Sequence, residues 1–263
     1  MQLRNRRFLL LGGTGGIGQS LLQALLAEGA VLLVASRQPE SLQLPEGASG
    51  VKLDLAAEDL DQQLQAITDT WSDIYGVIHC AGQNQFAGLS RTPVSAIDSQ
   101  LAVNLRSPML VARHFVSRFA AAGATGEGAL VFVGSTFGSI GFPGYTAYCA
   151  TKFGLRGFTE ALRRELADSS VQVVYVAPRA TATAMNPQVV NQLNQALGNA
   201  VDSPEMVAQR IVKAMTRDQR RCFMGWPERL FVVINGVLPR LVDRALFKQL
   251  PVIRRFLESG VSQ

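Results

Sequence analysis

The chain is poor in cysteine, and the few that it has form no recognisable pattern. Cys80, Cys149 and Cys222 are the three cysteines among 263 residues, and their separations do not match the spacing of metal ligands. Three thiols are also too few for the disulfide framework of a small secreted protein, which favours a reducing compartment. Residues 1–7 lead straight into an apolar run and do not have the pattern of a signal peptide. We therefore expect a cytoplasmic protein.

Long apolar runs are also missing. The longest apolar stretch, residues 230–239, is far shorter than the ~20 residues that a membrane-spanning helix needs. The sequence contains no internal repeat, and no change in composition marks a second folding unit. With 48% hydrophobic residues, the chain can bury one full core. We expect a single catalytic domain over residues 1–225, followed by an apolar and basic helical extension over residues 226–263.

Acidic residues are fewer than basic ones, 20 against 25, so the net charge is +5. The basic residues are spread along the chain, with concentrations in residues 4–7 and 217–255, and no nucleic-acid-binding module accompanies them. This distribution fits an anionic cofactor or an anionic membrane surface better than a nucleic-acid groove.

Short apolar runs recur along the chain and are typical of buried parallel strands. Helical patterns separate most of these runs, which predicts a doubly wound parallel α/β sheet of the Rossmann type, with helices on both faces. In such a sheet the ligand binds beyond the carboxyl ends of the strands. The runs cover residues 8–11, 31–34, 51–53, 76–78, 130–133 and 171–176.

A glycine-rich segment follows the first of these runs. Residues 12–18 read Gly-Gly-Thr-Gly-Gly-Ile-Gly, and residues 20–27 continue with a helical pattern. A strand that leads through glycines into a helix is the arrangement that a dinucleotide site requires. The glycines let the backbone approach a pyrophosphate, and the helix N-terminus offers unpaired N–H groups to it. A tight turn without a ligand is the alternative interpretation.

A hydroxyl, a phenol and an amine occur close together in residues 135–152. Tyr148 and Lys152 are four residues apart, so a helix would place them on the same face. A neighbouring cation lowers the pKa of a phenol, which makes Tyr148 the candidate acid or base. Ser135 lies upstream of them. The alternative is that a tyrosine and a lysine share a surface helix by chance.

Together and in this order, these features resemble the short-chain dehydrogenase/reductase family, in its subgroup of short single-domain chains. The family's Gly-x-x-x-Gly-Ile-Gly pattern matches residues 12–18, and its Tyr-x-x-x-Lys pattern matches Tyr148 and Lys152. Its upstream serine matches Ser135, its helix asparagine matches Asn104, and its acidic residue near the adenine matches Asp54. The resemblance covers about residues 7–185.

The resemblance implies an oxidoreductase that interconverts a carbonyl and an alcohol with NADP(H) or NAD(H). Tyr148 would pass the proton, Ser135 would hold the carbonyl oxygen, and Lys152 would bind the nicotinamide ribose and lower the Tyr148 pKa. Asn104 would fix a water that resupplies the proton. It lies within a helical pattern at residues 94–119, where asparagine is unfavourable, so we expect a local distortion or a specific hydrogen bond there. The implied cofactor-binding residues are Gly12, Thr14, Gly15, Gly16, Ile17, Gly18, Ser36, Arg37, Asp54, Leu55, Cys80, Ala81, Gly82, Tyr148, Lys152, Pro178, Arg179, Thr181 and Thr183.

The residues after the second strand favour NADP(H) over NAD(H). An acidic residue there would bind the ribose hydroxyls of NAD, whereas an arginine pairs with the 2′-phosphate of NADP. This chain has Ser36 and Arg37 at that point. It lacks the extra basic residue that many NADP-dependent members carry where Gly15 stands, which keeps NAD(H) open.

The sequence departs from the family pattern at three places. Leu11 replaces the threonine that often opens the glycine motif, and Cys80 replaces the asparagine of the Asn-Ala-Gly motif. Arg179 follows Pro178 where the family usually has glycine, so it points either towards a phosphate, towards an acidic substrate, or simply to the surface.

The substrate side of the site is expected to be apolar. Residues 141–145, just before Tyr148, would line it, and Phe86, Phe137 and Phe142 would form a wall, although simple packing explains each of them as well. Residues 187–198 occupy the place of the family's mobile lid. An apolar substrate follows, such as an acyl chain, a sterol-like molecule or an aromatic carbonyl compound.

The C-terminal extension and the oligomeric state leave alternatives open. The apolar and arginine-rich residues 226–256 fit a helix lying in a membrane interface, a subunit contact or a wall of the substrate pocket. The resemblance implies a homodimer or homotetramer formed through helices at residues 94–119 and 148–167. A non-catalytic redox sensor on the same fold is the rival function, and an epimerase or dehydratase is a second one.

Overall fold

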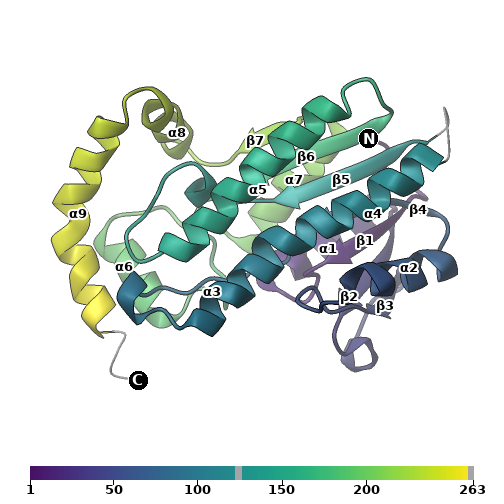
Figure 1. Cartoon of the computed structure of the whole chain (residues 1–263), viewed down its shortest axis with the longest axis horizontal. Coiled ribbons are helices and arrows are strands. Elements are labelled where there is room, and N and C mark those ends of the chain that lie inside the picture. Colours follow the sequence, from purple (N-terminus) through teal and green to yellow (C-terminus); the bar gives the residue numbers. More distant parts are fainter. Residues whose placement is uncertain (122–125, 260–263) are drawn as a thin grey trace.

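A parallel sheet lies between two layers of helices in the computed structural model, which describes residues 1–121 and 126–259 (Figure 1). Within these residues the sheet has seven strands in the order β3-β2-β1-β4-β5-β6-β7, and every neighbouring pair is parallel. The predicted Rossmann-type fold is confirmed. The strands are β1 (Arg7–Leu11), β2 (Val31–Ser36), β3 (Ala48–Lys52), β4 (Ile74–His79), β5 (Gly128–Val133), β6 (Val171–Ala177) and β7 (Arg221–Phe223).

Helices cover both faces of the sheet. In Figure 1, α2, α4 and α5 lie in front of the strands, and α1 and α7 lie behind them. The helices are α1 (Gly16–Ala27), α2 (Leu60–Thr70), α3 (Val94–Leu101), α4 (Ser107–Ala121), α5 (Thr146–Glu165), α6 (Gln188–Ala196), α7 (Pro204–Thr216), α8 (Glu228–Val237) and α9 (Pro239–Ser259). None of the described helices is long and apolar enough to cross a membrane.

The apolar runs are continuous because the strands are covered on both sides. In β1, Phe8 and Leu10 pack in one core cluster with side chains of α1 and α7. Leu9 and Leu11 alternate with them and pack in the second cluster with side chains of α2, α4 and α5. All four are fully buried, so β1 is fixed from both faces and its carboxyl end is held in place.

The strand order reverses between β1 and β4. Leu11, the last residue of β1, is paired with Ala35 of β2 on one side and with His79 of β4 on the other. The loops that follow β1 and β4 therefore begin side by side and diverge to opposite faces, which is where open α/β sheets bind their ligands.

Two features differ from the sequence-based expectation. The short strand β7 was not predicted, because Arg221–Phe223 contains no apolar run. The helical pattern over residues 94–119 forms three segments, with a π-helical segment, Ala102–Arg106, between α3 and α4. Asn104 lies in the middle of this segment, so the expected distortion is confirmed.

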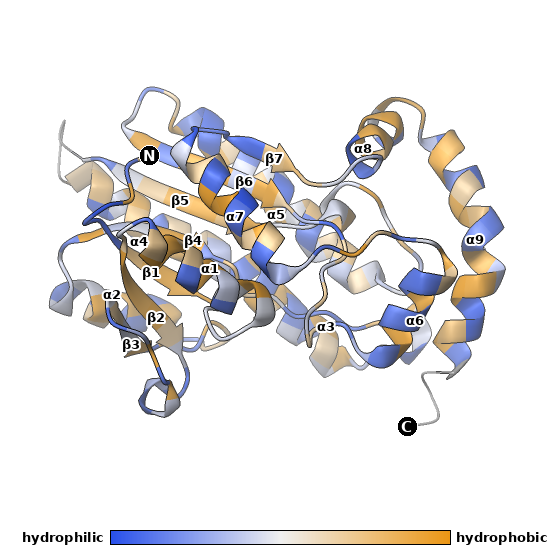
Figure 2. Cartoon of the chain, turned by 180° about the vertical axis from the view of Figure 1, so that it is seen from behind, coloured by the Kyte–Doolittle hydropathy of each residue, from blue (hydrophilic) through white to orange (hydrophobic). Residues whose placement is uncertain are grey.

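The last two helices lie outside the three layers. Helices α8 and α9 lie at one end of the molecule, where α9 runs beside α6 (Figures 1 and 2). Within this extension, Val242 and Ile253 are buried, and the Asn235 side-chain amide donates a hydrogen bond to the Ser139 carbonyl oxygen at 2.9 Å. The extension is therefore fixed to the body of the protein. The extension was expected over residues 226–263, of which residues 260–263 lie outside the described part of the chain.

Candidate active site

The glycine segment forms a tight turn between β1 and α1. Gly12 has φ +84°, a conformation that favours glycine, and the Gly15 N–H donates to the Gly12 carbonyl oxygen at 3.1 Å. A Cβ atom at Gly18 would overlap that same carbonyl oxygen. The turn therefore requires glycine at both positions, which brings the start of α1 close to the end of β1.

The first turn of α1 is open to a ligand. The helix begins at Gly16, and its N-cap residue, Gly15, provides no side-chain hydrogen bond to the N-terminal N–H groups. Uncapped N–H groups at a helix N-terminus attract anions. The small glycine surface lets a phosphate approach them, so this part of the chain fits the pyrophosphate of a dinucleotide.

Two further loops close around the glycine turn. A Cβ atom on Gly12 would lie 2.5 Å from the backbone nitrogen of Ala81, so the loop after β4 is packed directly against the turn. A Cβ atom on Gly16 would lie 2.7 Å from the Thr183 methyl carbon, which places the loop after β6 beside the start of α1. The structure thus brings the expected residues of three separate loops together.

The second half of the expected cofactor site lies beyond β2 and β3. Ser36 ends β2, and its hydroxyl accepts a hydrogen bond from the Gln38 N–H at 3.1 Å. Arg37 is exposed and borders a surface hollow together with Asp54. The Asp54 carboxylate accepts from the Ala56 N–H at 3.0 Å, which fixes the loop that contains Leu55.

Tyr148 and Lys152 lie on one face of α5, as their spacing predicts. Tyr148 is 9% and Lys152 is 3% exposed, and the lysine nitrogen is 5.7 Å from the centre of the tyrosine ring. The same ammonium donates to the Val133 carbonyl oxygen, at the end of β5, at 3.2 Å. Ser135 follows that strand and accepts from the Phe137 N–H at 3.1 Å. The phenol, the amine and the hydroxyl therefore meet at the carboxyl end of β5.

Burial decides the protonation state of this group. It raises the pKa of Tyr148 to about 12, and the hydrogen bond with the Ser135 side chain opposes this rise in pKa. The pKa of Lys152 falls to about 8, because burial disfavours its charged form. The net shift of the Tyr148 pKa is therefore upward, because desolvation dominates. The lowering that the resemblance implies for Lys152 stays a prediction. At neutral pH the phenol holds its proton.

Asn104 connects the loop after β4 to α5. Its side chain, fully buried, accepts from the Gln83 N–H at 2.8 Å and donates to the Gln83 carbonyl oxygen at 2.7 Å. The same amide nitrogen donates to the Thr151 hydroxyl at 3.1 Å. The specific hydrogen bond expected for Asn104 is thus present. A Cβ atom on Gly82 would lie 3.4 Å from the Asn104 oxygen and 3.5 Å from the Lys152 nitrogen, so both side chains border the same spot.

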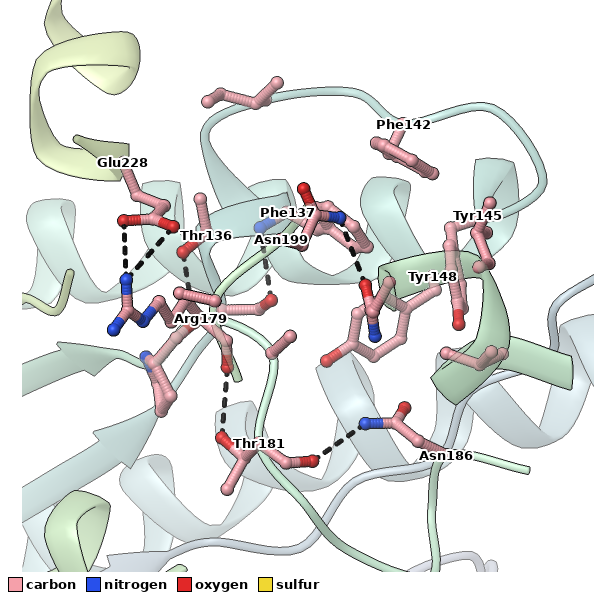
Figure 3. Close-up of a pocket in the computed structure, with 18 of the residues that line it drawn as sticks. Thr136, Phe137, Phe142, Tyr145, Tyr148, Arg179, Thr181, Asn186, Asn199 and Glu228 are labelled. Carbon is pink, nitrogen blue, oxygen red and sulfur yellow. Dashed lines mark hydrogen bonds and ion pairs between the residues drawn. The ribbon is translucent and has the colours of Figure 1, made fainter. Parts of the chain in front are cut away.

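A cavity of about 400 Å³ opens in front of Ser135 and Tyr148 (Figure 3). Phe137 and Phe142 are stacked along one wall, with ring centres 5.0 Å apart. Tyr145 lies beside them, as expected. Phe86 packs against the Tyr145 ring at 5.2 Å but is not part of the lining, and neither are residues 141, 143 and 144. The expected aromatic wall is therefore smaller than the sequence suggested.

The other walls come from the C-terminal third of the chain. Val190 and Leu193 of α6 line the cavity from within the segment expected to form a lid. Phe231 of α8 and Leu246 of α9 also line it. Four amide residues, Asn186, Asn194, Asn199 and Gln249, add polar groups to these walls, and the Asn199 side chain donates a hydrogen bond to that of Asn194 at 3.1 Å. Of the alternatives for the extension, a wall of the pocket is the one that these contacts support.

Arg179 is paired with two carboxylates. Its guanidinium nitrogens lie 2.7 Å from an Asp202 oxygen and 3.2 Å from a Glu228 oxygen. Figure 3 shows the pair with Glu228. Asp202 is buried, and Glu228 begins α8. The arginine thus joins the loop after β6 to the C-terminal extension through two protein carboxylates, and it also borders the cavity. Sequence reasoning missed both partners because nothing local marks residues this far from Arg179 in the chain.

The chain matches the model of the family described as short chain dehydrogenase over residues 6–194. An uncharacterised oxidoreductase of Bacillus subtilis, YxnA, is 26% identical over 94% of this chain and 73% of its own length. A mouse 3-oxoacyl-[acyl-carrier-protein] reductase is 32% identical over 67% of this chain and 75% of its own length.

Solved structures share the fold. A short-chain dehydrogenase from Burkholderia cenocepacia in complex with NADP superposes with a TM-score of 0.80, at 21% identity, over 94% of this chain and 99% of its own. A 3-ketoacyl-(acyl-carrier-protein) reductase from Brucella melitensis complexed with NADH gives a TM-score of 0.76 at 19% identity, over 86% of this chain and 98% of its own. At such low identities these likenesses show the architecture.

Proposed function

This chain belongs to the short-chain dehydrogenase family, and from that membership we propose that it is an NADP(H)-dependent oxidoreductase that interconverts an apolar ketone or aldehyde and its alcohol. The family membership makes it an oxidoreductase that binds a nicotinamide cofactor. The observation that carries the proposal is the position of Tyr148 and Ser135 between the glycine turn and a largely apolar cavity. A carbonyl carbon bound in that cavity lies between the cofactor site and the proton donor.

Tyr148 acts on the substrate oxygen. When bound, the nicotinamide cofactor supplies a hydride to the carbonyl carbon or takes one from the alcohol carbon. In reduction, the protonated phenol of Tyr148 donates its proton to the carbonyl oxygen as negative charge develops there. Ser135 donates a hydrogen bond to the same oxygen and holds it in place. In oxidation the proton returns from the alcohol to Tyr148.

Lys152 and Asn104 support the tyrosine from behind. The Lys152 ammonium carries a proton next to the Tyr148 ring and stabilises the phenolate that forms when the proton has left. It also provides donors for the ribose hydroxyls of the cofactor. Asn104 and Lys152 both border the position of Gly82, where a water held by Asn104 would restore the proton through Lys152.

NADP(H) is the proposed cofactor because of Arg37. Its side chain is exposed just beyond β2, at the point where the 2′-substituent of the adenine ribose lies in this fold. Asp54 and Leu55 would border the adenine of a bound cofactor, and Thr14, Ile17, Pro178, Thr181 and Thr183 would contribute around the glycine turn and the loop after β6. A guanidinium can form two hydrogen bonds with a phosphate. NADP(H) has a phosphate on the 2′-oxygen of the adenine ribose, and NAD(H) has none there.

The substrate is proposed to be an apolar carbonyl compound. The aromatic wall formed by Phe137 and Phe142, with Leu193, Phe231 and Leu246 opposite, favours an acyl chain or a ring system over a charged molecule. The names of the mouse and Brucella melitensis reductases indicate that those proteins act on oxoacyl groups. An apolar carbonyl substrate for this chain is consistent with that.

The assembly is proposed to be a homodimer or homotetramer in the cytoplasm, built through the helices at residues 94–119 and 148–167. Exposed apolar side chains on these helices support this: Leu101 of α3, Met109 of α4 and Phe153 of α5 are between 37% and 42% exposed. We propose that residues 1–225 are the catalytic domain and that the extension after residue 225 completes its pocket through α8 and α9.

The test is turnover of NADPH and NADH with a panel of aldehydes and ketones that range from short polar to long apolar compounds. We expect NADPH oxidation with the longer apolar members and little with the short polar ones. Tight binding of NADPH without turnover of any member, measured by calorimetry, would instead indicate a redox sensor.

A further inference from the structure

The outer side of the C-terminal extension exposes a row of apolar side chains. Leu230, Val233 and Val237 follow each other at helical spacing along α8 and are 44%, 62% and 72% exposed. Leu238 and Leu241, at the junction with α9, are also exposed, and so is Phe247 on α9. We call these six residues the outer face. A continuous group of this kind on a folded protein commonly marks a binding surface.

Basic side chains surround the outer face. Residues 226–259 contain six arginines and lysines and three acidic residues. One of these acids, Glu228, faces inward and is neutralised by Arg179. Within residues 1–121 and 126–259, no ion pair involves the four cations nearest the outer face, which are Arg229, Arg240, Arg244 and Lys248.

The two sides of α9 are distinct. Val242, Leu246, Gln249 and Ile253 recur on its inner side, where Val242 and Ile253 are buried and Leu246 and Gln249 line the cavity. Arg240, Arg244 and Phe247 lie on the opposite side, by the 100° rotation per residue of an α-helix. Because the inner side is anchored, the apolar and cationic side remains outward. Figure 2 shows both helices at one end of the molecule, away from the sheet.

We propose that the outer face docks on a lipid bilayer that contains anionic phospholipids. Its apolar side chains would enter the boundary between headgroups and acyl chains, and the surrounding cations would bind phosphate groups. A second copy of this chain is a poorer occupant. A two-fold contact would bring the same face of both copies together and so place unpaired arginines opposite one another.

Docking of the outer face would also bring one wall of the cavity, formed by α8, next to the lipid. Phe231 lines the cavity and is still 41% exposed, and it lies on the same helix as Leu230 and Val233. An apolar substrate dissolved in the bilayer would then enter the cavity beside Phe231 without crossing water. This second step rests on the proposed function, whereas the docking itself does not.

The test is flotation of the full-length protein with vesicles of phosphatidylcholine, alone or mixed with phosphatidylglycerol. We expect binding to the mixed vesicles that weakens with added salt, and little binding to phosphatidylcholine alone. The triple variant Arg240→Ala, Arg244→Ala and Lys248→Ala should bind the mixed vesicles about a hundredfold more weakly, at about fivefold for each cation near the surface. The variant Val233→Ser, Val237→Ser and Phe247→Ser should lose about tenfold or more.

Matched variants on other surfaces control for general effects. Lys213→Ala with Arg217→Ala removes two exposed cations at the end of α7, and Leu89→Ser with Val94→Ser removes two exposed apolar side chains near α3. Both should bind as the unmodified protein does. Equal flotation of the outer-face variants and the unmodified chain would overturn the proposal, as would the absence of any binding to the mixed vesicles.

Sedimentation in the absence of lipid tests the alternative that the outer face binds a second copy of the chain. Self-association that disappears in the Val233→Ser, Val237→Ser and Phe247→Ser variant, without vesicle binding by the unmodified protein, would assign the face to a second copy and overturn the proposal. Flotation does not depend on turnover, so its failure is distinct from failure of the proposed reaction.

Delivery of the substrate from the bilayer is tested with the triple variant Arg240→Ala, Arg244→Ala and Lys248→Ala. This variant should have a raised KM for a vesicle-borne carbonyl compound and an unchanged KM for a water-soluble one. An equal change in both would refute that step.

Discussion

The side-chain nitrogen of Lys152 lies over the ring of Tyr148, 5.7 Å from its centre and one turn further along α5. Both groups are buried, and burial shifts each pKa in the direction that favours the neutral form: the pKa of Tyr148 rises to about 12, and that of Lys152 falls to about 8. The lysine is therefore the group of the pair that changes charge closest to neutral pH.

The pH dependence of reduction should follow Lys152. The Lys152 side chain is mostly charged below pH 8 and mostly neutral above it, whereas Tyr148 keeps its proton on both sides of pH 8. Because the ammonium stabilises the phenolate that forms in reduction, kcat for carbonyl reduction should be level at pH 6 to 7 and fall as the pH rises through about 8.

The variant Lys152→Arg checks that assignment. A guanidinium keeps its proton far above pH 8, so the residual activity of this variant should lack the fall. A profile of the unmodified enzyme that stays level to pH 10, measured with saturating cofactor and substrate, would contradict the role given to Lys152.

Arg37 should set the preference between cofactors. Replacing it by alanine removes a charge-assisted pair with the 2′-phosphate, worth about 1.5 to 3 kcal/mol. KM for NADPH should therefore rise about tenfold or more in Arg37→Ala, with KM for NADH nearly unchanged. Arg217→Ala, which removes another exposed arginine, is the control and should alter neither value. An unchanged ratio of the two KM values in Arg37→Ala would refute the assignment.

Arg179 should contribute to the stability of the fold. Asp202 is 5% exposed, so Arg179→Ala leaves a buried carboxylate without its partner. We expect the free energy of unfolding in urea to drop by about 3 kcal/mol, and Arg179→Ala combined with Asp202→Asn should recover part of it. The control Arg113→Ala breaks an exposed pair with Asp61 and should cost less than about 1 kcal/mol. Equal losses in the two single variants would show that the Arg179 pair is no more than a surface contact.

The C-terminal extension should limit the size of the substrate. Leu246→Trp adds volume to the inner side of α9, where the cavity measures about 400 Å³. KM for a long apolar ketone should rise severalfold, while a short aldehyde should be turned over as before. Phe247→Trp, one residue on but facing outward, is the matched control and should change neither. If both substrates respond equally to Leu246→Trp, the extension does not shape the pocket.

Local patterns allowed much of the fold and the centre of the site to be predicted. The apolar runs located five strands closely, because parallel strands covered on both faces have few polar residues to interrupt them. The run at residues 51–53 overlaps only the end of the edge strand β3, three of whose residues are exposed. The glycine turn and the pair of Tyr148 and Lys152 could be found because each depends on a few neighbouring residues. Asn104 was flagged by its low helix propensity, and its π-helical segment explains that signal.

What could not be predicted depends on contacts between distant parts of the chain. The pairing of Arg179 with Glu228 joins residues 49 positions apart, and the lining by Phe231 and Leu246 depends on where α8 and α9 pack. The net upward shift of the Tyr148 pKa could not be predicted, because spacing indicates a nearby cation but does not reveal how deeply the phenol is buried. Desolvation is a property of the whole fold.

The most direct test of the account is the rate of carbonyl reduction by Tyr148→Phe, measured together with the dissociation constant of NADPH. The change removes one oxygen from the site, so kcat should fall by about 10² to 10⁴ while the dissociation constant stays within about twofold. Tyr145→Phe, which alters a neighbouring ring of the same cavity, should retain kcat within a few fold. If Tyr148→Phe keeps most of the activity of the unmodified enzyme, Tyr148 is not the proton donor and the proposed mechanism is wrong.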